Sequence, residues 1–156
     1  MKSALITTFT ALVYLFVPNV VEAQSQVVRI VGFNDFNFGS WNGSGALNRT
    51  DRLCVFKRTR FGFPPANTRY RIRARGSGPG GRFQVRSSDN DVLNYRVFFR
   101  GSVGGFQELQ RNQRRNFRNS VARRAACGAG NARLRIRFTQ NELGKAFSGD
   151  YSGTIF

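Results

Sequence analysis

Apolar and polar residues alternate with a period of two along most of the chain. The clearest segments cover residues 69–75, 82–86, 93–100 and 133–138, and arginine fills most of the polar positions in them. Strict alternation is typical of a strand that turns one face toward a core and the other toward water. We therefore expect four strands that each carry an outward arginine row.

Three further extended segments are predicted. Residues 27–38 begin apolar on both faces, residues 50–58 carry Cys54, and residues 150–156 end the chain. Turn-rich segments such as 39–45 separate the strands. Short alternating strands at this spacing favour an all-β fold, an antiparallel sandwich or barrel.

The first 23 residues have the pattern of a signal peptide. Lys2 gives a positive start, residues 4–17 are mostly apolar, and Ala23 is a small residue before the expected cut. A membrane anchor is the less favoured alternative, because the apolar run is shorter than the roughly 20 residues that cross a bilayer. We expect export to the periplasm, the cell surface or the medium, and a single mature domain over residues 24–156.

Two cysteines remain in the expected mature chain, Cys54 and Cys127. In an exported protein, two thiols favour one disulfide bond. The alternative, a metal pair, is poor because the chain has no histidine.

The charge is strongly positive, with 25 Lys and Arg against 8 Asp and Glu, a net charge of +17. Nearly all basic residues are arginine, which binds planar anions through two parallel hydrogen bonds. This composition predicts contact with anionic polymers such as polysaccharide, lipopolysaccharide or nucleic acid. The strand rows predict an anion-binding face, either functional or merely solvated, formed by Arg69, Arg71, Arg73, Arg75, Arg133, Arg135 and Arg137.

Residues 107–126 do not alternate regularly. Leu109, Phe117 and Val121 could form one weak helical face, so we expect a long basic loop with at most a turn of helix, ending near Cys127. Its arginines resemble an RNA-binding segment, but the export signal favours a solvated loop. The basic-loop arginines are Arg111, Arg114, Arg115, Arg118, Arg123 and Arg124.

Catalytic signals are weak. Gly76, Gly78 and Gly81 match a dinucleotide-binding spacing, but Pro79 and a following strand favour a glycine-rich hairpin. General acid–base catalysis most often uses histidine, which is absent, and residues 87–91 read as a turn rather than a calcium site. We expect no enzyme activity, no cofactor, no metal and no small-molecule substrate.

Several strand patterns carry a resemblance to a known family. They are residues 36–41 (FNFGSW), 70–78 (YRIRARGSG), 93–99 (LNYRVFF) and 149–155 (GDYSGTI), with the cysteine strand after the first of them. In this order they resemble the spore coat protein U domain, the family that includes subunits of archaic (Csu-type) chaperone–usher pili.

The resemblance implies an immunoglobulin-like antiparallel β-sandwich that lacks its last strand. A periplasmic chaperone, and later a neighbouring subunit delivered by an usher, would supply that strand. Only residues 24–26 precede the first expected strand, so a terminal or non-polymerising relative stays an alternative. The implied strand-acceptor groove is lined by Phe36, Phe38, Leu134, Ile136, Tyr151 and Ile155.

Two functions follow from these patterns. The first is a pilus-subunit-like structural protein of a bacterial envelope, acting by donor-strand-type assembly in surface attachment or biofilm. The alternative is a free secreted cationic protein that binds anionic polymers through its arginine-rich strands.

Overall fold

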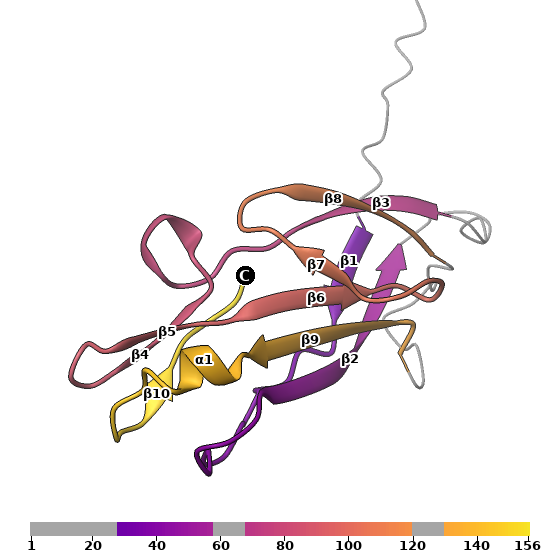
Figure 1. Ribbon diagram of the computed structural model, residues 1–156. Helices are drawn as coiled ribbons and strands as arrows, with labels where there is room; N and C mark the ends of the chain where they lie inside the picture. Colours follow the sequence, from indigo (N-terminus) through magenta and orange to yellow (C-terminus); the bar gives the residue numbers. More distant parts are fainter. Residues whose placement is uncertain (1–27, 58–67, 120–129) are drawn as a thin grey trace, which may run out of the picture.

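The computed structural model describes residues 28–57, 68–119 and 130–156, and these form an almost entirely β-structure (Figure 1). The strands are β1 (Val28–Val31), β2 (Leu47–Lys57), β3 (Thr68–Arg73), β4 (Gln84–Ser87), β5 (Val92–Asn94), β6 (Arg96–Arg100), β7 (Gln107–Leu109), β8 (Arg114–Asn119), β9 (Ala132–Phe138) and β10 (Tyr151–Ser152). A 3₁₀ turn, η1 (Pro79–Gly81), and one short helix, α1 (Gln140–Leu143), complete them. All pairings between these strands are antiparallel, which confirms the predicted sandwich-like fold.

The larger layer is a five-stranded sheet in the order β1-β2-β9-β6-β7. Its central strand, β9, shows the predicted alternation, since Leu134, Ile136 and Phe138 are buried and the arginines between them are not. At the start of β9, the Asn131 side chain extends the pairing with β2 by exchanging two 2.8 Å hydrogen bonds with the Val55 backbone.

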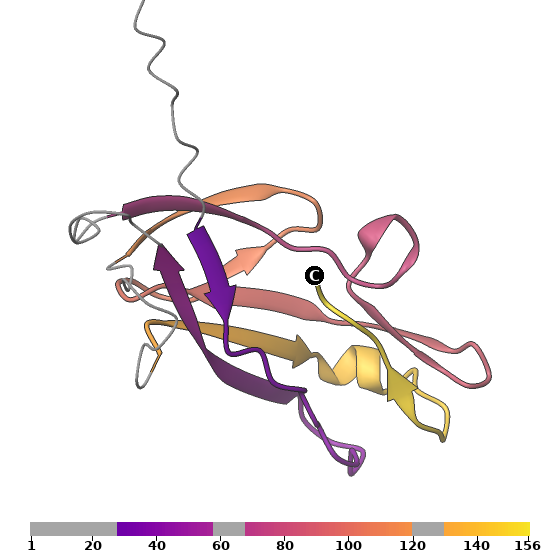
Figure 2. The same cartoon turned by 180° about the vertical axis from the view of Figure 1, so that it is seen from behind.

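The second layer combines two smaller units, the β3–β8 ribbon and the β10-β4-β5 sheet. The C-terminal segment connects them: β10 pairs with β4, while the backbones of Arg75 and Phe156 exchange hydrogen bonds of 2.9 and 2.7 Å. In both views the C-terminal segment runs from beside β4 toward the extension of β3 (Figures 1 and 2).

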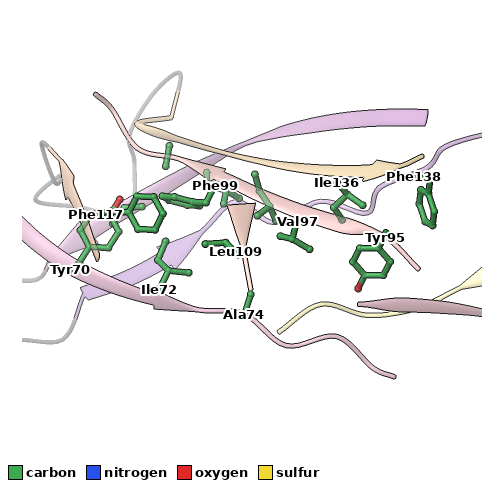
Figure 3. Packing of buried hydrophobic residues seen from close by; sticks show 14 of the residues in the cluster. Tyr70, Ile72, Ala74, Tyr95, Val97, Phe99, Leu109, Phe117, Ile136 and Phe138 are labelled. Carbon is green, nitrogen blue, oxygen red and sulfur yellow. The ribbon is translucent and has the colours of Figure 1, made fainter. Parts of the chain in front are cut away.

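The core lies between the layers. Its largest fully buried side chains are Phe99, Leu53, Val55 and Val97, all from the five-stranded sheet. The ribbon packs on this sheet through aromatic rings: the Tyr70 ring meets Phe99 edge-on at 6.4 Å, and Phe117 meets Phe99 at 4.8 Å. Figure 3 shows the Tyr70 ring beside Phe117, with Ile72 and Ala74 following it along the same segment.

The predicted single strand over residues 93–100 is wrong in one respect, because it divides at Tyr95 into two strands of different sheets. β5 pairs with β4, whereas β6 pairs with β9 and β7. The Tyr95 N–H donates to the Phe83 carbonyl, and the Asn94 N–H donates to Glu142 of α1 at 2.9 Å. These tertiary partners separate the two halves, although the alternation continues through them.

The predicted basic loop over residues 107–126 is also wrong where the structure describes it. Residues 107–109 and 114–119 are the strands β7 and β8. Phe117 lies opposite Tyr70 and is buried, so it faces the core as a strand residue and not as part of a helical face. The alternation was hidden because Arg115, on the inner side of β8, turns its guanidinium to Gln107 and to the Glu108 carbonyl instead of entering the core.

The first predicted strand is shorter than expected. Only Val28–Val31 pairs with β2, and residues 32–46 form an irregular segment in which Asn34 donates to the Asp51 carboxylate. β2 correspondingly begins at Leu47 rather than at residue 50. The signal peptide, Cys127, Val121, Arg123 and Arg124 lie outside the described residues, so the disulfide bond from the buried Cys54 to Cys127 stays a prediction.

Candidate interaction surfaces

The outer side of the five-stranded sheet gathers arginines from neighbouring strands. Directly opposed residues of an antiparallel pair share a face, and the register places Arg52 opposite Arg133 and Arg133 opposite Arg100. Two further rows run parallel to this one through Arg135 and Arg137 of β9. We call this surface the sheet face; its members are Arg52, Arg96, Phe98, Arg100, Phe106, Arg133, Arg135 and Arg137.

Two phenylalanines lie among these arginines. The guanidinium carbon of Arg135 is 3.7 Å from the centre of the Phe106 ring, and that of Arg100 is 5.7 Å from it. Arg96 lies over Phe98 at 5.2 Å. Such cation–π contacts contribute about 0.5–1 kcal/mol at exposed sites, so the rings hold guanidinium groups against the sheet.

Glu108 of β7 is the carboxylate that the register places on this face, opposite Phe98. It accepts hydrogen bonds from Nε of Arg96 at 2.8 Å and from Nη2 of the same guanidinium. The hydrogen bond from Arg96 lowers the pKa of Glu108 below its usual range, against a smaller opposing effect of desolvation. In the described part of the chain the ion pairs are Arg96–Glu108 and Lys145–Glu142, so the other sheet-face arginines have no carboxylate partner there.

The β3–β8 ribbon carries a second arginine surface on its outer side. Arg69 lies opposite Arg118, Arg71 opposite Asn116, and Arg73 opposite Arg114. We call this the ribbon face; its members are Arg69, Arg71, Arg73, Arg114, Asn116 and Arg118, all exposed. Within the described residues, no aromatic ring lies against these arginines.

The seven arginines predicted to form one anion-binding face are divided between these two surfaces. Arg69, Arg71 and Arg73 belong to the ribbon face, Arg75 follows β3 on the same side, and Arg133, Arg135 and Arg137 belong to the sheet face. Because Tyr70 and Phe99 meet in the core between the two layers, the two outer faces point away from each other. The rows therefore do not join into a continuous positive surface.

The basic-loop arginines are likewise separated. Arg114 and Arg118 are ribbon-face residues, Arg115 ties β8 to β7, and Arg111 forms an isolated bridge with Ala74. The predicted anion-binding face did not include Arg52, Arg96, Arg100 or Phe106, although Arg96 and Arg100 were expected in an outward row of their own. The alternation of residues 93–100 was a signal for Arg96 and Arg100, but Arg52 and Phe106 join the face only through the register.

The predicted strand-acceptor residues lie around the core. Leu134 and Ile136 are buried within it, whereas Phe36, Phe38, Tyr151 and Ile155 are partly buried and pack against it. Phe38, from the irregular segment after β1, meets Phe138 edge-on at 5.0 Å. Leu134 and Ile136 are thus interior residues, and the partly buried four are the accessible members of the set.

The predicted glycine hairpin forms a tight turn. Gly81 and Gly78 are joined by a backbone hydrogen bond of 2.9 Å, and Gly78 donates to the Arg82 carbonyl at 3.1 Å. A Cβ at Gly76 would lie 2.1 Å from the Arg82 carbonyl oxygen, so the close approach of backbone requires glycine.

A small cavity lies among the described residues. It has a volume of about 50 Å³, lies beside the glycine turn and is lined by Ser77, Gly78, Gln84, Val85, Arg86 and Val92. Small-molecule sites usually span about 300–1,000 Å³.

Among the described residues, no group of three or more His, Cys, Asp or Glu side chains could hold a metal ion. No helix in the same residues has the length and apolar character to cross a membrane.

The pKa of the Tyr95 hydroxyl is markedly shifted. Desolvation raises the pKa of the buried Tyr95 to about 12, and its hydroxyl lies 3.5 Å from the Thr154 carbonyl. Tyr95 packs between Phe83 and Phe138 in the core. The shift therefore reflects core burial at the point where β5 passes into β6.

Comparison with known proteins supports the fold. No protein-family model matches the chain, and no curated protein matches it. A chain of the solved structure described as "Chaperone-tip adhesin complex is vital for synergistic activation of CFA/I fimbriae biogenesis" is similar, with a TM-score of 0.56 and 15% identity, over 84% of this chain and 39% of that chain. The protein thus shares the fold of part of that chain and spans less than half of that neighbour's length, while membership of the spore coat protein U family stays a prediction.

Proposed function

We propose that the protein is an exported, pilus-subunit-like structural protein of a bacterial envelope that assembles by strand addition. Its partners would be a periplasmic chaperone, an usher or neighbouring subunits, and its role surface attachment or biofilm formation. The similarity to a chain of a fimbrial chaperone–adhesin complex supports the proposal. The proposal assigns no catalytic step to any residue.

The observation that carries the proposal is the β1 edge of the five-stranded sheet. Among the described strands, β1 has a ladder partner only in β2, so its other edge is open to a further strand. An open edge offers backbone hydrogen bonds to an added strand, and nearby apolar side chains select its residues. Val28 and Ile30 are half-buried there, and Phe33 just beyond them is 57% exposed.

The test is thermal unfolding of the mature protein with a synthetic peptide of alternating apolar residues and with a scrambled peptide. A ligand that binds only the folded state at about 100 times its Kd adds about 2.7 kcal/mol, so the first peptide should raise Tm and the scrambled one should not. Phe33→Ser should weaken the effect. The matched control is Val103→Ser, which changes another exposed apolar residue, 75% exposed, in the loop between β6 and β7.

A stable monomer whose Tm responds to neither the peptide nor a co-expressed chaperone would contradict strand assembly. Co-purification from the periplasm gives an independent measurement, because a strand-deficient subunit should emerge bound to a chaperone.

A second candidate function is binding of an anionic polymer. It is favoured by the alignment of Arg52, Arg133 and Arg100 across three strands. Opposed like charges destabilise a sheet, and an anionic partner would offset this repulsion.

A further inference from the structure

We propose that the sheet face binds an acidic polysaccharide through the carboxylates of its uronate residues. The proposal deepens the second candidate function, binding of an anionic polymer, and does not depend on strand assembly. It assigns the ligand to one of the two arginine surfaces and excludes the other.

Most arginines of the sheet face have no carboxylate partner in the described part of the chain. Arg52, Arg100 and Arg133 lie in one row across three strands. Arg135 and Arg137 continue along β9, and Glu108 is committed to Arg96. A face with this excess of guanidinium groups attracts a polyanion, and each group can accept a carboxylate in a planar, two-bond arrangement.

The spacing of the row suits a sugar chain. Neighbouring strands lie about 4.7–4.9 Å apart, so a polymer lying across β2, β9 and β6 meets a new arginine at that interval. This is close to the advance of one pyranose in a 1→4-linked chain. Because successive residues of a twofold 1→4-linked chain turn their carboxylates to opposite sides, the uronates that face the protein recur every second residue, which is about two strand spacings. Their carboxylates can therefore reach Arg52 and Arg100 at the two ends of the row.

The aromatic rings distinguish this ligand from a nucleic acid. Single-stranded nucleic acids bind by stacking bases on exposed aromatic rings between basic residues. Here the Arg135 guanidinium already covers Phe106 at 3.7 Å, and Arg96 lies over Phe98. The rings thus fix the positions of cations, and the face recognises anionic groups rather than bases.

The experiment compares two charge-matched variants of the mature protein. The sheet-face variant carries Arg52→Gln, Arg100→Gln, Arg133→Gln and Arg137→Gln, and the ribbon-face variant carries Arg69→Gln, Arg71→Gln, Arg73→Gln and Arg118→Gln. Both lose the same net charge. Binding is measured to immobilised polygalacturonate, to its fully methyl-esterified neutral form and to single-stranded DNA, with unfolding curves to confirm that both variants fold.

We expect the Kd for polygalacturonate to rise about tenfold or more in the sheet-face variant and less than about threefold in the ribbon-face variant. The esterified polymer should not bind. Equal losses in the two variants would overturn the site assignment while leaving anionic-polymer binding intact. Displacement of polygalacturonate by DNA at equal charge concentration would overturn the ligand class, and a wild-type protein that binds no polyanion would refute the second candidate function as well.

If the sheet-face variant does not fold, Phe106→Leu provides the same test without a change of charge. It releases the guanidinium groups of Arg135 and Arg100 from the ring, so polygalacturonate affinity should fall about two- to fivefold, a change of the size of one exposed cation–π contact. Unchanged affinity in that variant would contradict the proposed role of the ring.

Discussion

The sheet face and the ribbon face arise from the same sequence pattern but are built differently. On the sheet face, β9 lies between two partners: Arg135 packs on the Phe106 ring, and Arg137 lies opposite the ion-paired Arg96. On the ribbon face, the two strands pair only with each other among the described residues, and there Arg69 opposes Arg118 without a neighbouring ring or carboxylate. An arginine row in sequence therefore becomes an organised surface only where a neighbouring strand supplies its partners.

The largest expected difference is in the core beneath the two faces. Phe99 lies under the sheet face with 1% exposure, and Phe117 lies under the ribbon face with 6%. Phe99→Ala should lower the free energy of unfolding by about 3–5 kcal/mol and expose amides throughout the sandwich to hydrogen exchange. Phe117→Ala should mainly expose amides of β3 and β8. If each substitution exposes the amides of all strands together, the ribbon and the sheet unfold as one cooperative unit. The difference between the two faces would then have no counterpart in local stability.

The next effect concerns the hydrogen bonds that join the ribbon to the five-stranded sheet. Arg115 donates to Gln107 Oε1 at 3.0 Å and to the Glu108 carbonyl at 2.8 Å, which joins β8 to β7. Arg115→Ala should cost about 0.5–1.5 kcal/mol in chemical denaturation. The adjacent Arg114→Ala, on the exposed ribbon face, should cost less than about 0.5 kcal/mol. Equal losses of stability in the two variants would show that the hydrogen bonds of Arg115 do not stabilise the ribbon.

A smaller effect is expected from the ring that organises the sheet face. Phe106→Leu should lower stability by about 0.5–1 kcal/mol, because it removes the contacts of Arg135 and Arg100 with the ring. Phe147→Leu is the control, since Phe147 is 71% exposed and meets no guanidinium group of the described residues. A loss of the same size in both variants would show that the ring contributes only apolar area.

The smallest effect is the pH dependence of the Arg96–Glu108 ion pair on the sheet face. Because Arg96 lowers the pKa of Glu108, the pair stabilises the folded state above the unfolded-state value of about 4.3. That stability is lost as the pH falls through the lower folded-state pKa. Glu108→Gln should therefore be less stable than wild type by under about 1 kcal/mol at neutral pH, and the gap should close in acid. A difference in stability between wild type and Glu108→Gln that stays constant from neutral to acidic pH would assign the effect to packing. The control is Asp150→Asn, which changes an exposed carboxylate in the loop before β10.

Much of the fold was predictable from local pattern. The alternation of Leu134, Ile136 and Phe138 with arginines specified a half-buried strand, and β9 is that strand. The same reasoning identified β3, β4 and β6 and the turn after Ser87, where the Asn90 N–H donates to the Ser87 carbonyl. It failed for β8, because Arg115 occupies an inward position that an apolar residue normally fills.

By itself, the sequence determined the class of fold, the outward arginine rows and the excess of positive charge, because these depend on residue type and a period of two. Tertiary structure decided the rest. The division at Tyr95 depends on partners from β4 and α1, and the separation of the arginine rows depends on which strands pair. Strand pairing joins residues far apart in the chain, so the meeting of Arg52, Arg100 and Phe106 on one face follows from long-range register and packing and from no local pattern.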